Sequence, residues 1–176
     1  MFAGYGVVLQ NASPDEDALD VEMTVNLVDA ADRILESDSQ TIAAIPAATT
    51  YYAGGEAIWD GSTPAARVEV SVRVGDRQKK KIQILPPVAN VRVSSDLFGT
   101  DVLGEFSNPY SQSMSSLARI TAVCFDAAGN VIGGGRSYPE GSVPPGGRIG
   151  FDVSLEGLEA TQIASAQVSV EPDTGS

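Results

Sequence analysis

The chain has 176 residues, 43% of them hydrophobic and 6% aromatic, which is enough for one large or two small domains with aliphatic cores. Its 23 acidic and 11 basic residues give a formal charge of -12, which argues against binding to nucleic acid or to an anionic membrane surface. One cysteine and no histidine exclude an intramolecular disulfide, the usual zinc sites and histidine-dependent catalytic triads.

Alternation of apolar and polar residues predicts strands, beginning with "LDVEMTVNL" at 19–27. The pattern recurs in "VEVSVRV" at 68–74, "VANVRVSS" at 88–95 and, more weakly, "AQVSV" at 166–170, and no window shows clean helical spacing. Turn-forming residues lie between these segments: "NASPDED", "DAAD", "AGG" and "DGSTP" in the first half, "SNPYS", "DAAGN" and "PPGG" in the second. We therefore predict an all-β protein with antiparallel sheets.

The sequence repeats with an offset of 97 residues, which aligns Asp29 with Asp126 and "LQN" at 9–11 with "FSN" at 106–108. After one inserted residue, "IPAA" aligns with "VPPG" and "RVEVSV" with "SAQVSV". Such a period predicts two copies of one domain, because solenoid units have only about 20 to 50 residues. We predict two β-sandwiches, a first repeat at residues 1–85 and a second repeat at residues 86–176.

The segment "CFDAAGNVIG" at 124–133 resembles the FxLYD family of bacterial and archaeal surface domains. Cys124, Phe125 and Asp126 stand where that family has Leu-Tyr-Asp. The first repeat has "LVDAADRIL", with Val28 at the aromatic position and Asp32 where glycine is usual. The resemblance covers both repeats and implies two tandem antiparallel immunoglobulin-like β-sandwich domains of a secreted or membrane-anchored protein, with no assigned catalytic residues.

The predicted strand at 88–95 precedes the core of the second repeat, and its counterpart in the first repeat would lie upstream of Met1. We therefore expect an open sheet edge in the first repeat, available for edge-strand pairing with a partner or for homo-oligomer formation unless it is covered. A hairpin turning at Gly75 and Asp76 is expected to return residues 80–85 along an edge of this repeat.

Three aromatic residues, Tyr51, Tyr52 and Trp59, are concentrated at 50–61 and predict either a ligand-binding strand beside an inter-domain cleft or packing of core and interface. Neighbours in a strand point to opposite faces, so one of the two tyrosines is expected at a surface or at the contact between domains. The glycines at 53–55 and 133–135 are expected to allow a bulge or close strand packing, because no helix follows to form a phosphate-binding loop.

Three aspartates, Asp15, Asp17 and Asp20, predict either a calcium site or a solvated acidic turn. Their spacing lacks the glycine and distal glutamate of an EF-hand, and we expect no other cofactor. The basic run "RQKKK" at 77–81 is either a local anion contact or a solvated linker. Cys124 aligns with the inward-facing Leu27 and is expected to be a buried apolar residue rather than a nucleophile.

Because no catalytic constellation is recognisable, the expected function is a non-enzymatic extracytoplasmic module: a spacer, adhesion or accessory domain of a cell-surface or secreted protein. Its partner would be a protein or another cell-surface component, and the alternative is a ligand-binding protein. No stretch approaches the roughly 18 apolar residues of a membrane span. The first residues lack the features of a signal peptide, so this location requires a targeting segment upstream of Met1.

Overall fold

The computed structural model describes residues 2–80, 84–97 and 99–172, and this part of the chain is all-β with antiparallel pairing in every sheet. No helix within it is long and apolar enough to cross a membrane. The first repeat contributes β1 (Phe2–Gln10), β2 (Glu16–Val28), β3 (Ile34–Ile45), β4 (Thr50–Ile58) and β5 (Arg67–Lys79). The second repeat contributes β6 (Val88–Ser95), β7 (Thr100–Ser107), β8 (Ile120–Phe125), β9 (Val131–Ser137), β10 (Arg148–Ser154) and β11 (Ser165–Val170).

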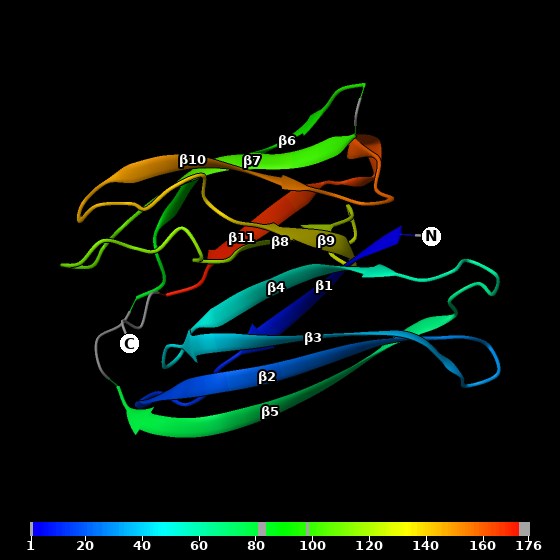
Figure 1. The fold of residues 1–176 in the computed structure, drawn as a ribbon, viewed down its shortest axis with the longest axis horizontal. Coiled ribbons are helices and arrows are strands. Elements are labelled where there is room, and N and C mark those ends of the chain that lie inside the picture. Colours follow the sequence, from blue (N-terminus) through cyan, green and yellow to red (C-terminus); the bar gives the residue numbers. More distant parts are fainter. Residues whose placement is uncertain (1, 81–83, 98, 173–176) are drawn as a thin grey trace.

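The strands form four sheets, ordered β3-β2-β5, β1-β4, β11-β8-β9 and β10-β7-β6. Figure 1 shows them stacked in this order, with β2 and β5 at the bottom and β6, β7 and β10 at the top. The two middle layers come from different repeats, and β1 and β4 both contact β9. The two sequence repeats therefore lie directly against each other.

Strand pairing is the same in the two repeats. In the first, β1 pairs with β4, and β2 lies between β3 and β5. In the second, β7 pairs with β10, and β8 lies between β9 and β11. The difference is β6, which pairs with the free side of β7 and has no counterpart on β1 among the described residues.

The repeated Asp-Ala-Ala motif closes equivalent hairpins. Asp29 Oδ1 accepts hydrogen bonds from the backbone N–H groups of Ala31 and Arg33, at 2.8 and 2.9 Å. Asp126 Oδ1 accepts from Ala128 and Asn130, at 2.9 and 2.8 Å. A short carboxylate that bonds the backbone two residues on favours a tight turn, which explains why the motif occurs twice.

The repeated asparagine has an equivalent structural role. Asn11 and Asn108 are both buried, and the Nδ2 of each donates to a backbone carbonyl at a later loop: Ile45 O for Asn11, at 3.0 Å, and Val143 O for Asn108, at 2.8 Å. These carbonyls occupy aligned positions. The sequence repeat therefore extends to individual side-chain hydrogen bonds, which anchor the end of β1 or β7 to that loop.

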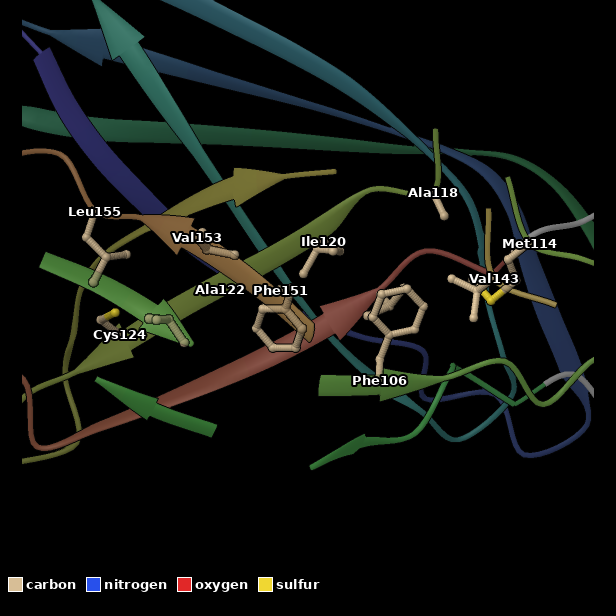
Figure 2. Close-up of a cluster of buried hydrophobic side chains, with 12 residues drawn as sticks. Phe106, Met114, Ala118, Ile120, Ala122, Cys124, Val143, Phe151, Val153 and Leu155 are labelled. Atoms are coloured by element: carbon tan, nitrogen blue, oxygen red, sulfur yellow. The ribbon is translucent and has the colours of Figure 1, made fainter. Parts of the chain in front are cut away.

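The core of the second repeat is aliphatic, with two phenylalanines (Figure 2). Phe106, Ile120 and Cys124 are all fully buried. Burial raises the pKa of the Cys124 thiol to about 11, so it is protonated at neutral pH. As predicted, Cys124 and its counterpart Leu27 are both core residues.

Three local predictions need correction. Residues 53–55 lie inside β4 rather than in a turn. Gly75 and Asp76 lie inside β5 rather than at a hairpin. The N–H of Lys80 adds one hydrogen bond to Asp15 O, at 2.8 Å, but Ile84 and Leu85 belong to no strand, and residues 81–83 fall outside the described ranges. The sequence 67–79 instead remains paired with β2 on both sides of Gly75, which itself has no partner in the register.

Candidate functional site

The contact between the repeats depends on glycines of β1 and β4. Gly6 and Gly54 face β8 and β9 of the second repeat: a Cβ at Gly6 would lie 2.6 Å from Gly133 O, and one at Gly54 would collide with backbone oxygens of Ala122 and Gly135. Real Cβ atoms essentially never approach within 3.0 Å of another heavy atom. The glycines therefore allow two sheet backbones to approach more closely than side chains would permit.

Hydrogen bonds join these two sheets at the same place. Tyr52 N–H donates to Ser169 Oγ at 2.9 Å, and Thr121 Oγ1 donates to Tyr52 O at 2.6 Å. The Tyr52 ring packs edge-to-face on Phe125, with centroids 6.3 Å apart. The backbone N–H, the backbone carbonyl and the aromatic ring of Tyr52 thus all take part in the contact, and such interactions fix the relative orientation of the repeats.

An ion pair of the second repeat caps the free edge of β3. Arg119 Nη2 lies 3.8 Å from Glu171 Oε2 and donates to Thr41 O at 3.2 Å. The N–H of Ala43 donates to Glu171 Oε1 at 2.7 Å. Both charged side chains are mostly buried, with 17% and 13% of their surfaces exposed. The pair occupies the place that a neighbouring strand would take, and it satisfies two backbone groups of this sheet edge, Thr41 O and Ala43 N–H.

A second polar network lies between the same layers. The Tyr5 hydroxyl donates to Asp38 and accepts from Gln40 Nε2 at 2.8 Å. Arg136 Nη1 donates to Asp38 Oδ2 at 3.2 Å. Burial, and then the hydrogen bond to the Asp38 carboxylate, raise the pKa of Tyr5, so its hydroxyl stays protonated and remains a donor. This network joins β1 and β3 of the first repeat to β9 of the second.

The predicted aromatic residues do not gather on one surface. Tyr51 is fully buried in the core of the first repeat, whereas Tyr52 lies at the contact between repeats. The prediction that one of the two tyrosines would leave the core is confirmed. Trp59 follows β4, half-buried, and its indole N–H donates to Thr63 O at 3.0 Å.

The predicted acidic residues are also dispersed. Asp17 is fully buried, and its Oδ1 accepts from the N–H of Ala47 at 2.8 Å. Asp15 and Asp20 are exposed, and Asp20 adopts a left-handed conformation with φ of 47°. Within the described ranges, no three acidic or cysteine side chains converge as metal ligands.

The open edge of β1 and the inner face of β5 together line an apolar groove, which we call the β1/β5 groove. It has a volume of about 420 Å³, and its lining includes Val8, Leu9, Ser13, Val72, Val74 and Arg77. On β5, the valines at 68, 70 and 72 are 48%, 43% and 47% exposed. They pair with buried Leu27, Val25 and Met23 of β2, so they lie on the core side of the sheet. A core-facing surface is therefore open to solvent.

Comparison with models of known protein families finds no match, and comparison with curated protein sequences finds none either. Among solved structures, a red sea bream transglutaminase is similar at 10% identity with a TM-score of 0.31. The alignment covers 96% of this chain and 27% of the transglutaminase, so the chain corresponds to about a quarter of that protein's length.

Close strand packing was predicted for the glycines at 53–55 and 133–135 and is confirmed, but its place between the repeats was not predicted, and neither was the buried ion pair. Alignment of the repeats contains a signal for both. Gly54 aligns with Asp152, and the pair Glu22 and Arg73 aligns with Arg119 and Glu171, with the signs reversed. A substitution of charge by glycine at equivalent positions of one fold indicates that one copy exposes this face and the other covers it.

Proposed function

We propose that the chain is a non-enzymatic structural module, a rigid spacer or accessory unit of a cell-surface or secreted protein, made of two tandem immunoglobulin-like sandwiches. The observation that carries this proposal is the contact between the repeats, where Gly6 and Gly54 bring two sheet backbones together. Flexibly linked domains do not need such close approach. A fused unit holds its two ends at a fixed separation, as a spacer requires.

The chemistry of the side chains supports a role without catalysis. The chain has no histidine, and its single thiol is buried with a pKa of about 11, so it is not a thiolate at neutral pH. The resemblance to FxLYD surface domains supports the proposed location, and mass spectrometry of cell-associated protein, compared with protein from the cytosol, would test that location directly.

Thiol labelling tests whether the two repeats open as one unit. Cys124 reports on the second repeat, and a variant with Leu27→Cys and Cys124→Ala places the thiol at the equivalent core position of the first. If the repeats are fused, both thiols react through the same global opening, with the same denaturant dependence once global stability has been matched. If one thiol is labelled through an opening of much lower free energy than the other, the repeats are independent domains, which would contradict the spacer proposal.

A further inference from the structure

No strand of the described residues pairs with the free side of β1, and the geometry of this place can be read from the second repeat. There β6 pairs antiparallel with β7, placing Val88 opposite Phe106 and Val93 opposite Val102. The same strand also contacts β11. By the repeat alignment, a strand in the β1/β5 groove would lie opposite Leu9 and Tyr5 of β1.

The side chains of β5 around this place are more exposed than their counterparts on β11, as expected where no strand covers them. The valines at 68, 70 and 72 of β5 are between 43% and 48% exposed. Their counterparts on β11 are covered: Ala166 and Val168 are half-buried, and Val170 is fully buried. Covering the β5 valines would remove apolar surface from water, which is the main driving force for docking a strand here.

The backbone of β1 is also ready to pair. Asn11 N–H donates to Thr49 O on the β4 side, whereas Gly4 N–H donates to Glu156 O on the other side. Hydrogen-bonding directions alternate along a strand, so Gly6, Val8 and Gln10 direct their N–H and C=O groups to the open edge. No strand of the described chain pairs with them. They form a template for one added strand.

The occupant must be a single strand rather than the edge of a second folded copy. In this chain β5 extends past the edge of β1, as the exposure of the core-side valines of β5 indicates: the β1-β4 sheet does not cover them. A second molecule that offered its own β1 in antiparallel pairing would bring its β5 into the layer already filled by β2 and β5. Only a strand without a covering sheet fits the place.

Positive charge at one end of the groove indicates the charge of the residues that flank the docked strand there. Arg77 lines the groove beside Ser13, and Lys79 and Lys80 follow it, whereas the whole chain has a charge of -12. Among the described residues, no acidic side chain forms an ion pair with these three cations. An antiparallel strand in the register of β6 begins at this end, opposite Leu9. An acidic residue before its first apolar position would therefore be attracted to the groove.

We propose that the β1/β5 groove accepts one extended strand of a partner polypeptide, which pairs antiparallel with β1 in the register that β6 adopts on β7. The strand carries apolar residues at the positions that face β5 and acidic residues at its N-terminal flank. It completes the first repeat as β6 completes the second. This site gives the proposed spacer a specific point of attachment.

Peptide binding to the full chain tests the proposal. The probe is a fluorescent peptide with the sequence "DDVANVRVSS", which is the β6 sequence preceded by two aspartates, and its companion carries two lysines instead. We expect saturable binding of the acidic peptide, with affinity about tenfold weaker for the lysine peptide. On binding, amide exchange of Gly6, Val8 and Gln10 should slow by about tenfold or more.

Two variants locate the site. Val70→Asp places a charge on the exposed inner face of β5, and Ser71→Asp places the same charge on the outer face as a matched control. Val8→Pro removes an N–H that points to the open edge, where proline is tolerated without loss of the β4 pairing. We expect Val70→Asp and Val8→Pro to weaken binding by about tenfold or more, and Ser71→Asp to leave it unchanged. Circular dichroism verifies that each variant is folded.

Three results would overturn the proposal. The first is no binding of either peptide to the folded wild-type chain at about 1 mM. The second is binding that Val70→Asp and Val8→Pro do not weaken. The third is a stable dimer of the chain that Val8→Pro dissociates, which would assign the edge to a second copy instead of a partner strand.

Discussion

The two repeats have the same strand pairing but opposite surface chemistry on equivalent faces. In the first repeat, the outer side of the β1-β4 sheet is glycine at positions 4, 6 and 54, where the second repeat has Asp101, Leu103 and Asp152. The reverse holds for the other sheet, where Asn26 and Ser37 of the first repeat correspond to Val123 and Gly134 of the second. One fold can therefore be adapted to two different environments by changes confined to the residues of a single sheet face.

The largest effect is expected from adding one methyl group to the contact between repeats. Gly54→Ala should destabilise the protein by about 3 kcal/mol, because the new Cβ meets backbone oxygens that cannot move aside cheaply. Asp152→Ala alters the equivalent position on an exposed strand and should have little effect. Denaturant unfolding of both variants measures the difference. Equal stabilities would show that the glycine contact is not required.

A smaller loss is expected from the ion pair. Arg119→Ala removes a mostly buried guanidinium and leaves Glu171, Gln40 and Thr41 without their partner, so it should cost about 2 kcal/mol. The equivalent residue of the first repeat, Glu22, pairs with Arg73 at 2.9 Å in solvent. Glu22→Ala should leave the unfolding midpoint unchanged, because exposed ion pairs contribute little. A comparable loss in both variants would contradict the assigned role of burial.

The smallest effect concerns acid stability of the hairpins. A backbone hydrogen bond from Arg33 lowers the pKa of Asp29, and the Asn130 side chain lowers that of Asp126. A lowered folded-state pKa stabilises the protein above the unfolded pKa of about 3.9, and this contribution is lost as pH falls through the folded value. Between pH 7 and pH 3, the melting temperature of wild type should therefore fall further than that of the Asp29→Asn, Asp126→Asn variant.

The two single variants sharpen this comparison. Asp29 forms an ion pair with Arg33 at 2.7 Å and exposes only 2% of its side chain. Asp126 is half-buried, and its partner at the position equivalent to Arg33 is the uncharged Asn130. Asp29→Asn should therefore remove more of the acid dependence than Asp126→Asn. Identical melting curves for the two single variants across this pH range would count against the comparison.

Local patterns in the sequence predicted four of the eleven strands of the described residues, β2, β5, β6 and β11, because alternation directly reflects one buried face. The strand at 88–95 has the predicted bounds, and 19–27 lies inside the longer β2. Gly75 and residues 53–55 were both included among the turn-forming segments, although glycine also occurs in strands approached closely by another backbone, as was expected separately for residues 53–55. Which of these applies depends on the neighbouring layer, and a local pattern contains no information about that layer.

Features that require both repeats at once were harder to predict. Cys124 was assigned to the core through its alignment with Leu27, which is a property of one domain. One of Tyr51 and Tyr52 was expected at a surface or at the domain contact. The sequence did not indicate that this residue is Tyr52 or that its partners are Thr121 and Ser169, because these partners lie on a sheet of the other repeat. Comparison of the repeats predicted the open edge of β1, whereas the exposure of the β5 valines depends on how far β5 extends past β1.

The glycine face also limits how many such units can stack. A head-to-tail contact between identical units would in principle continue into a filament, because each unit offers one face of each kind. Here the outer face of the first repeat carries Asn26 and Ser37 where the contact uses Val123 and Gly134, and the outer face of the second carries Asp101 and Asp152 where the contact uses glycine. The outer faces of the two repeats therefore lack the residues of the contact, and a third repeat could not stack on either face in the same geometry.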